Sequence, residues 1–220
     1  MQKIHSVLVV VGTSLVAFGI LLFLIIGSTA FMGIGSYNNM VSLSEKVDAQ
    51  WSNVENVYQR RFDLIPNLVE TVRGYASHEA DTLTAVTEAR AKVGQVNINP
   101  SQLTPESLAQ FQTAQDGLSS MLSRLMVVVE RYPDLKANEN FIRLQDELSG
   151  TENRIAVERR NYNESARSYN TLKKTFPDVV FVSVARSFFD TDFQDKPYFE
   201  AEAGSDRAPK VDFSSSRRGQ

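Results

Sequence analysis

The sequence predicts an all-α protein, in which an N-terminal transmembrane helix is followed by an antiparallel, up-down four-helix bundle of long helices. A long uncharged stretch near the N-terminus predicts the first part, and four later segments with three-then-four apolar spacing predict the second. The expected parts are a short N-terminal segment at 1–6, the transmembrane helix at 7–36, the bundle at 37–176 with helices at about 37–62, 66–94, 104–132 and 136–176, an aromatic-rich segment at 177–203, and a polar, disordered tail at 204–220.

The uncharged stretch runs from Val7 to Ile34 and is dominated by Val, Leu, Ile and Phe. A helix needs about 20 apolar residues to span a bilayer. A cleaved signal peptide is the alternative, with Lys3 before the stretch and the small residues 28–30 as its cleavage site. We favour an uncleaved anchor because the stretch is about twice as long as a signal-peptide core. Lys3 and Lys46 flank it almost evenly, so charge leaves the orientation open.

The four periodic segments place apolar residues on one helical stripe, and the last two keep nearly a seven-residue repeat, as in coiled coils. The third stripe consists of Leu108, Phe111, Gln115, Leu118, Leu122, Leu125, Val129 and Tyr132. The fourth consists of Phe141, Leu144, Leu148, Thr151, Ile155, Tyr162, Tyr169 and Phe176. Such stripes are the seams along which helices of a bundle pack.

The breaks between these segments contain proline or glycine. Pro66 is expected to separate the first two helices by a turn, or else only to kink one longer helix. A loop is expected at 94–100. Thr104 and Pro105 then resemble the cap and first position of the third helix.

Composition excludes several kinds of site. The chain has no cysteine and two histidines, and its net charge is −3, so disulfides, thiolate chemistry and a broad basic surface for nucleic acid are excluded. His78, Glu79 and Asp81 lie close together, but Thr82 stands where a second histidine of a metal motif would be, so we interpret them as a solvated helix face. We expect no catalytic, cofactor-binding or metal-binding residues.

Charged residues near the apolar stripes have two interpretations. Arg60, Arg61 and Asp63 lie together, and Glu79 and Arg90 lie in the second segment. They could form an acid–base or anion-binding cluster. We favour interhelical ion pairs that fix the register of the bundle, the better-attested use of polar groups in such seams.

Two further groups are candidates for structural or oligomer contacts. Tyr-Asn pairs occur at Tyr37-Asn38, Tyr162-Asn163 and Tyr169-Asn170, and we expect them to form a hydrogen-bonded layer beside the membrane. The aromatic-rich segment contains Phe188, Phe189, Phe193, Tyr198 and Phe199. It is expected to pack on the bundle, on a neighbouring copy or on the membrane interface.

Several motifs resemble the LemA family. They include the run Gln-Arg-Arg-Phe-Asp-Leu-Ile-Pro-Asn-Leu-Val at 59–69, Gly-Tyr-Ala-x-His-Glu at 74–79, Tyr-Pro-Asp-Leu-Lys-Ala-Asn at 132–138, the Tyr-Asn pairs and Tyr-Phe-Glu at 198–200. The resemblance covers about residues 37 to 200. It implies a bacterial, membrane-anchored four-helix bundle in the inner membrane, with the bundle in the cytoplasm, and it supplies no defined activity.

The leading functional hypothesis is a non-enzymatic membrane scaffold that self-associates into a homo-oligomer, partly through an exposed aromatic tail. The expected partners are the lipid bilayer and further copies of the chain, with no cofactor and no nucleic acid. The alternative is an adaptor or signalling component that docks another membrane protein, such as a protease or sensor. An enzyme using His78, Glu79 and Arg90 is the least favoured hypothesis.

Overall fold

The computed structural model describes residues 2–96, 98–100, 103–189 and 193–200, with the side chains of 2–11, 186, 188 and 189 left undescribed. These residues form helices and irregular segments, and no strand occurs among them. The helices are α1 (Gln2–Tyr75), α2 (Ala80–Gln95), α3 (Pro105–Val129), α4 (Pro133–Lys136), α5 (Glu139–Lys174) and α6 (Asp178–Phe189). The protein is therefore all-helical, as the sequence predicted.

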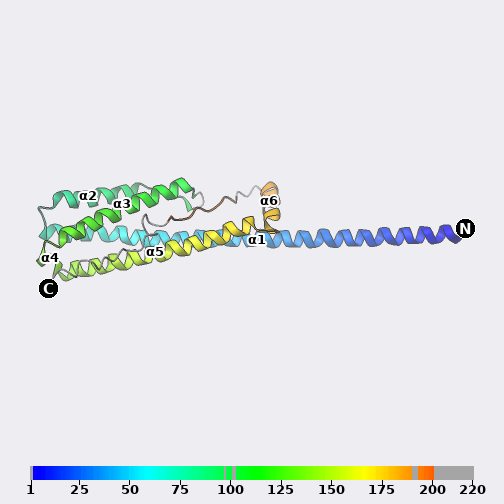
Figure 1. Ribbon diagram of the computed structural model, residues 1–220, viewed down its shortest axis with the longest axis horizontal. Coiled ribbons are helices and arrows are strands. Elements are labelled where there is room, and N and C mark those ends of the chain that lie inside the picture. Colours follow the sequence, from blue (N-terminus) through cyan, green and yellow to red (C-terminus); the bar gives the residue numbers. More distant parts are fainter. Residues whose placement is uncertain (1, 97, 101–102, 190–192, 201–220) are drawn as a thin grey trace, which may run out of the picture.

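Helix α1 combines the apolar N-terminal stretch and the first stripe of the packed region in one element. Figure 1 shows its N-terminal part extending far beyond the other helices. The large apolar side chains from Leu15 to Ile34 are exposed there. Within the described chain, α1 is the one helix long and apolar enough to cross a membrane. An uncovered apolar helix of this length is suited to lipid, which is consistent with a membrane anchor.

Of the two expectations for Pro66, a turn or one longer helix, the structure has the longer helix: α1 continues through Pro66 to Tyr75, and the chain turns at residues 76–79. Proline lacks an N–H group, so the carbonyl of Phe62 four residues earlier loses its helical donor. Arg90 of α2 replaces that donor, since its Nε donates to the Phe62 oxygen at 3.1 Å. Its guanidinium also lies 3.7 Å from the centre of the Phe62 ring. The two predicted helices at 37–62 and 66–94 are thus divided at residues 76–79, between α1 and α2, and not at Pro66.

α1, α2, α3 and α5 share the part of the molecule at the end of α1 remote from the apolar stretch (Figure 1). α1 packs mainly on α5, while α2 and α3 form a hairpin. α3 and α5 begin and end close to the predicted ranges 104–132 and 136–176. The predicted cap of α3 is confirmed, since the Thr104 hydroxyl accepts from the Ser107 amide at 3.1 Å behind Pro105.

The apolar stripes form two buried clusters. The one nearer the membrane segment contains Trp51, Tyr58, Phe111, Tyr162 and Tyr169 among others. The second lies beyond it and contains the apolar residues around Ile65, Leu125 and Phe141. All but three members of the predicted third and fourth stripes are buried: Leu144 and Tyr132 pack partly buried against the second cluster, and Phe176 is 80% exposed. Phe176 departs from the prediction because α5 ends at Lys174.

The Arg90–Phe62 contact can be tested with a double-mutant cycle. Arg90→Met keeps most of the packing volume but removes the donor, and we expect it to lower the free energy of unfolding by about 1–2 kcal/mol. The substitution Pro66→Ala restores a backbone N–H at that position, so Arg90→Met should cost much less in that background. Thermal and chemical unfolding of the full chain in detergent measures both. Equal costs in the two backgrounds would contradict the proposed role of Arg90.

Candidate functional site

A groove along α5 holds residues 193–200 in an extended conformation. In Figure 1 this segment runs back from α6 over the bundle. Asn163 of α5 pairs with it at two points: its Nδ2 donates to the Phe199 carbonyl at 3.0 Å, and its Oδ1 accepts from the Phe199 amide at 2.9 Å. Asn170 holds Lys196 in the same way, at 2.8 and 2.9 Å. These side-chain amides replace the peptide groups of a neighbouring strand, so the groove recognises the backbone of its occupant.

The spacing of the two asparagines matches the geometry of the segment. Seven helical residues advance by about 10.5 Å, and three extended residues cover about 10 Å. Asn163 and Asn170 can therefore bind residues 199 and 196 without distortion. Gln112 of α3 extends the pattern by pairing with the backbone of Glu200 at 3.0 and 3.3 Å.

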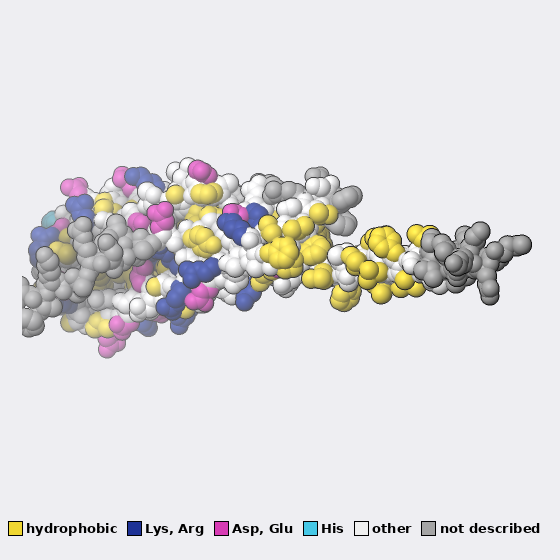
Figure 2. Space-filling view, turned by 45° about the vertical axis from the view of Figure 1, so that its right-hand side comes forward, with side chains coloured by type: hydrophobic (Ala, Val, Ile, Leu, Met, Phe, Trp, Pro, Cys, Tyr) yellow, Lys and Arg dark blue, Asp and Glu magenta, His cyan; other side chains and the backbone are white. Residues whose placement is uncertain are grey.

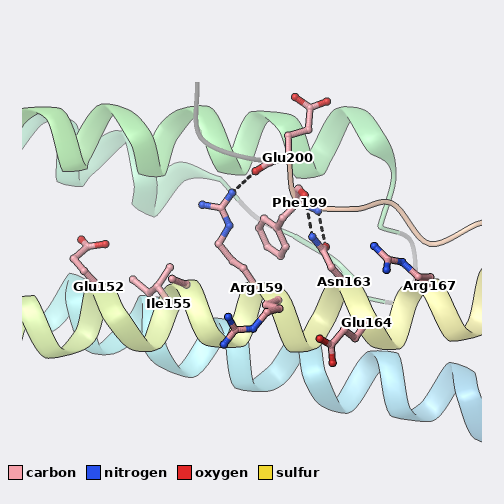
Figure 3. Close-up of a pocket in the computed structure, with 10 residues that line it drawn as sticks. Glu152, Ile155, Arg159, Asn163, Glu164, Arg167, Phe199 and Glu200 are labelled. Atoms are coloured by element: carbon pink, nitrogen blue, oxygen red, sulfur yellow. Dashed lines mark hydrogen bonds between the residues drawn. The ribbon is translucent and has the colours of Figure 1, made fainter. Parts of the chain in front are cut away.

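An aromatic pocket holds the end of the segment. The Phe199 ring stacks on Trp51 with centroids 6.0 Å apart and planes 9° apart, and it meets Tyr162 edge-on at 5.4 Å. The Arg159 guanidinium lies 5.0 Å from the Phe199 ring and also donates to the Glu200 carbonyl (Figure 3). Phe199 is consequently buried, and its ring fixes the position of the backbone that the amides bind.

Ion pairs hold the middle of the segment. Lys196 contacts Asp48 of α1 at 2.9 Å, and Asp195 accepts from Lys173 and Lys174 of α5. Hydrogen bonds from Lys173 and then Lys174 lower the pKa of the Asp195 carboxyl below its ordinary 3.8. A lowered pKa means that this contact stabilises the docked segment above that ordinary value, and the contribution disappears as the pH falls through the lowered one.

Two of the Tyr-Asn pairs that were expected to form a hydrogen-bonded layer place their asparagines against the docked segment. The rings of Tyr162 and Tyr169 are buried, and the Tyr162 hydroxyl has no partner among the described atoms. Burial raises the pKa of Tyr162. The asparagines point into the groove instead, because both amide atoms find complete partners on an extended backbone.

The residues of the first Tyr-Asn pair, and the aromatic residues of the C-terminal segment, are buried to different degrees. Tyr37 packs edge-on against Phe193 with centroids 5.9 Å apart, whereas Asn38 is exposed. Phe193 and Phe199 are buried in their own chain, so this part of the aromatic-rich segment packs on the helices, the first of the three expected places, and does not form an exposed tail. Tyr198 is 44% exposed, and its hydroxyl contacts Asn170. The side chains of Phe188 and Phe189 lie outside those that the structure describes.

A buried polar layer separates the two apolar clusters. Arg61 is only 2% exposed, and its Nη1 donates to Glu152 Oε1 at 2.7 Å and to Ser119 Oγ at 3.0 Å. Its Nη2 donates to Gln115, the polar member of the third stripe. The Tyr58 ring lies 5.1 Å away, and burial raises the pKa of Tyr58. One arginine thereby joins α1, α3 and α5 at a single level.

The neighbours of Arg61 have weaker contacts. Arg60 approaches Glu147 of α5 at 3.9 Å, with both side chains largely in solvent. Asp63 accepts from Gln59 at 2.8 Å and is exposed, so the negative partner of Arg61 is Glu152 rather than the adjacent aspartate. Pro66, one turn after Arg61, is exposed. Because it has no N–H group, it leaves the Phe62 carbonyl free to accept a hydrogen bond from Arg90.

Glu79 connects the turn after α1 with the end of α3. It accepts from Arg131 at 2.9 Å and from the Tyr132 hydroxyl at 3.0 Å. The hydrogen bond to Glu79 raises the pKa of Tyr132. Glu79 thus has structural partners, and no three potential metal ligands gather within the described part of the chain.

An open cleft of about 710 Å³ lies beside the groove, between α5 and the docked segment. Figure 3 shows the side chains that line it. Its wall mixes cations such as Arg159 and Arg167 with anions such as Glu152 and Glu164. A wall of mixed charge that opens to solvent suits contacts with polar peptide groups. It lacks the enclosed, apolar shape typical of small-molecule sites.

The amide contacts predict how the groove loses its segment. Asn163→Leu removes two hydrogen bonds without much change in volume and should favour release by about 2 kcal/mol, or roughly 30-fold. Trp51 is the single tryptophan, so its emission should shift to longer wavelength as Phe199 leaves. The Lys196 and Phe199 amides should exchange with solvent faster. Asn161→Leu is the matched control, because Asn161 contacts Glu158 within α5. Indistinguishable spectra and exchange rates would refute the role of Asn163.

Two neighbouring carboxylates test the buried layer. Glu152→Ala leaves the buried Arg61 without its counter-charge and should cost about 2–3 kcal/mol of unfolding free energy. Glu147→Ala removes the exposed partner of Arg60 and should cost less than about 1 kcal/mol. Chemical unfolding of both variants measures the difference. Equal losses of unfolding free energy in the two variants would show that an ion pair with the buried Arg61 stabilises the protein no more than one with the exposed Arg60.

The comparisons with known proteins agree with the motifs. Magnetosome protein MamQ 2 of Paramagnetospirillum magneticum is 29% identical over 92% of this chain and 75% of its own length. Protein LemA of Metamycoplasma hominis is 29% identical over 72% of this chain and 69% of its own. Magnetosome protein MamQ of Magnetospirillum gryphiswaldense is 30% identical over 64% of this chain and 58% of its own. The model of the LemA family matches residues 50–213, so the chain belongs to the LemA family.

Proposed function

We propose that this protein is a non-enzymatic, membrane-anchored helical scaffold that self-associates into a homo-oligomer at the bacterial cytoplasmic membrane. The observation that carries this proposal is the continuity of α1, in which one helix is both the apolar span and the central element of the packed region. A continuous helix transmits position and orientation from the bilayer to the bundle without a flexible hinge. Family membership and the likeness to magnetosome proteins support a membrane-associated role.

The polar groups near the core support a structural rather than a catalytic role. Arg61, Glu79 and Arg90 each bind a partner on another helix or turn. These contacts act as cross-links in an antiparallel four-helix bundle, with the bundle placed on the cytoplasmic side as the family resemblance implies. A bundle fixed in this way is a rigid rod suited to bearing lateral contacts.

The outer side of the α2–α3 hairpin is the surface that we assign to self-association. It carries a groove of about 690 Å³ lined mainly by small or apolar residues, including Ala85, Ala89, Ala114, Gly117 and Met121. Small residues allow a neighbouring helix to approach closely. All copies stand on the same membrane, so lateral contact between identical hairpins needs no further partner.

A second candidate function is an adaptor that docks another membrane protein, such as a protease or sensor. The observation that favours it is the recognition of backbone by Asn163, Asn170 and Gln112. Backbone recognition depends little on the side chains of the occupant. An extended segment of another protein with one aromatic residue at the Trp51 pocket could therefore replace residues 193–200.

The mass of the full chain in mild detergent, measured by light scattering, tests the proposal. We expect a discrete assembly that Gly117→Leu weakens by filling the hairpin groove. Gly150→Leu is the matched control, since an added Cβ atom meets open space at both positions within the chain. A monomer would overturn the scaffold proposal and favour the adaptor. An assembly that both variants leave intact would exclude the hairpin as its interface.

A further inference from the structure

Helix α6 lies across α1 at the point where the packed region ends and the apolar stretch begins (Figure 1). The Phe181 ring lies so close to α1 that a Cβ atom added at Gly33 would be 3.1 Å from it. Asp178 at the start of α6 accepts a hydrogen bond from Ser36. The last exposed apolar side chain of the stretch, Ile34, lies between these two contacts along α1. α6 is therefore held at the level where the apolar span of α1 ends.

Beyond Asp178, the one charged residue of α6 is Arg186, whose side chain is not described. The exposed residues described on the helix, Val180, Ser183, Val184 and Ser187, are uncharged. Val182 and Ala185 are buried against the rest of the protein. Val180 and Val184 on the opposite face are each 50% exposed. A helix that covers a protein in water normally presents charged residues on that face.

The serines of the exposed face are also suited to an apolar environment. Ser183 donates its hydroxyl to the Val179 carbonyl at 2.7 Å, and Ser187 donates to the Ser183 carbonyl at 3.3 Å. Thr29 in the apolar stretch of α1 makes the same kind of contact with Ile25 at 2.9 Å. A hydroxyl bonded within its own helix needs no water, so it can face lipid at low cost.

We infer that α6 is a membrane-surface helix, whose Val180 and Val184 face enters the outer part of the bilayer on the bundle side. Figure 2 supports a lipid occupant, since hydrophobic side chains gather on this face where the packed region meets the apolar helix. Phe176, 80% exposed just before α6, adds an aromatic side chain of the kind found at membrane interfaces. This inference rests on the membrane anchoring in the proposed function.

The absence of native cysteine allows a direct test on the full chain. Val184→Cys and Val180→Cys, each labelled with an environment-sensitive fluorophore, are reconstituted into phosphatidylethanolamine–phosphatidylglycerol vesicles containing brominated phosphatidylcholine. We expect a shift to shorter wavelength and about twofold quenching by the brominated lipid. Val127→Cys is the control for an exposed apolar position, because Val127 is 72% exposed near the end of α3 remote from α6. Its label should respond to aqueous iodide and not to the lipid.

Phe23→Cys separates this inference from the anchoring on which it rests, because Phe23 lies within the apolar stretch. Lipid quenching at positions 23, 180 and 184 supports the membrane-surface helix. Quenching at 23 with iodide access at 180 and 184 overturns it and leaves the anchor intact. Shielding of 180 and 184 from both quenchers overturns it in favour of a protein contact. Failure of quenching at 23 removes the anchor itself.

Discussion

The structure depends on keeping α1 unbroken at Pro66. A proline in the middle of a helix leaves one carbonyl without a donor, and a buried or half-buried carbonyl in that state normally ends or bends the helix. Here Arg90 supplies a charged donor to the Phe62 oxygen and covers the Phe62 ring. Because α1 continues, the chain reverses only at residues 76–79. The position of this turn determines where α2 and α3 pack along α1. The same arginine joins α2 to α1, so it contributes both to the continuity of α1 and to the position of the hairpin.

Arg61 plays a complementary part from inside the bundle. The apolar seams on either side of it are periodic, and periodic seams permit a shift of one helix by a repeat at modest cost. A buried guanidinium that needs Gln115, Ser119 and Glu152 together can be satisfied in one register only. The desolvation of such a group is expensive, so its value lies in specificity more than in net stability. We regard the layer as the element that selects one alignment of α1, α3 and α5.

Sequence reasoning succeeded where the signal is periodic and local. The apolar stripes, the cap at Thr104 and the uncharged stretch all follow from short-range patterns, and the structure buries or exposes those residues accordingly. Local rules leave the choice between a turn and a longer helix at Pro66 open, because the compensating donor lies 28 residues away. The seven-residue spacing of Asn163 and Asn170 is visible in the sequence, but their partner is an extended segment without periodicity. A seven-residue repeat of asparagine on the polar side of an aromatic stripe was the available signal for a groove that binds backbone.

The groove and the membrane are connected through a short piece of chain. α6 contacts α1 at Gly33 and Ser36, and the docked segment begins at residue 193, four residues after α6 ends. Four residues of chain span at most about 14 Å, so the segment cannot travel far unless α6 moves as well. An α6 held on the bilayer therefore keeps residues 193–200 close to their own groove, at a high effective concentration, and a competing peptide must overcome that advantage. If α6 lies on the membrane as we infer, its removal from the bilayer would weaken this tether, and occupancy of the groove would then depend on the state of the membrane beside it.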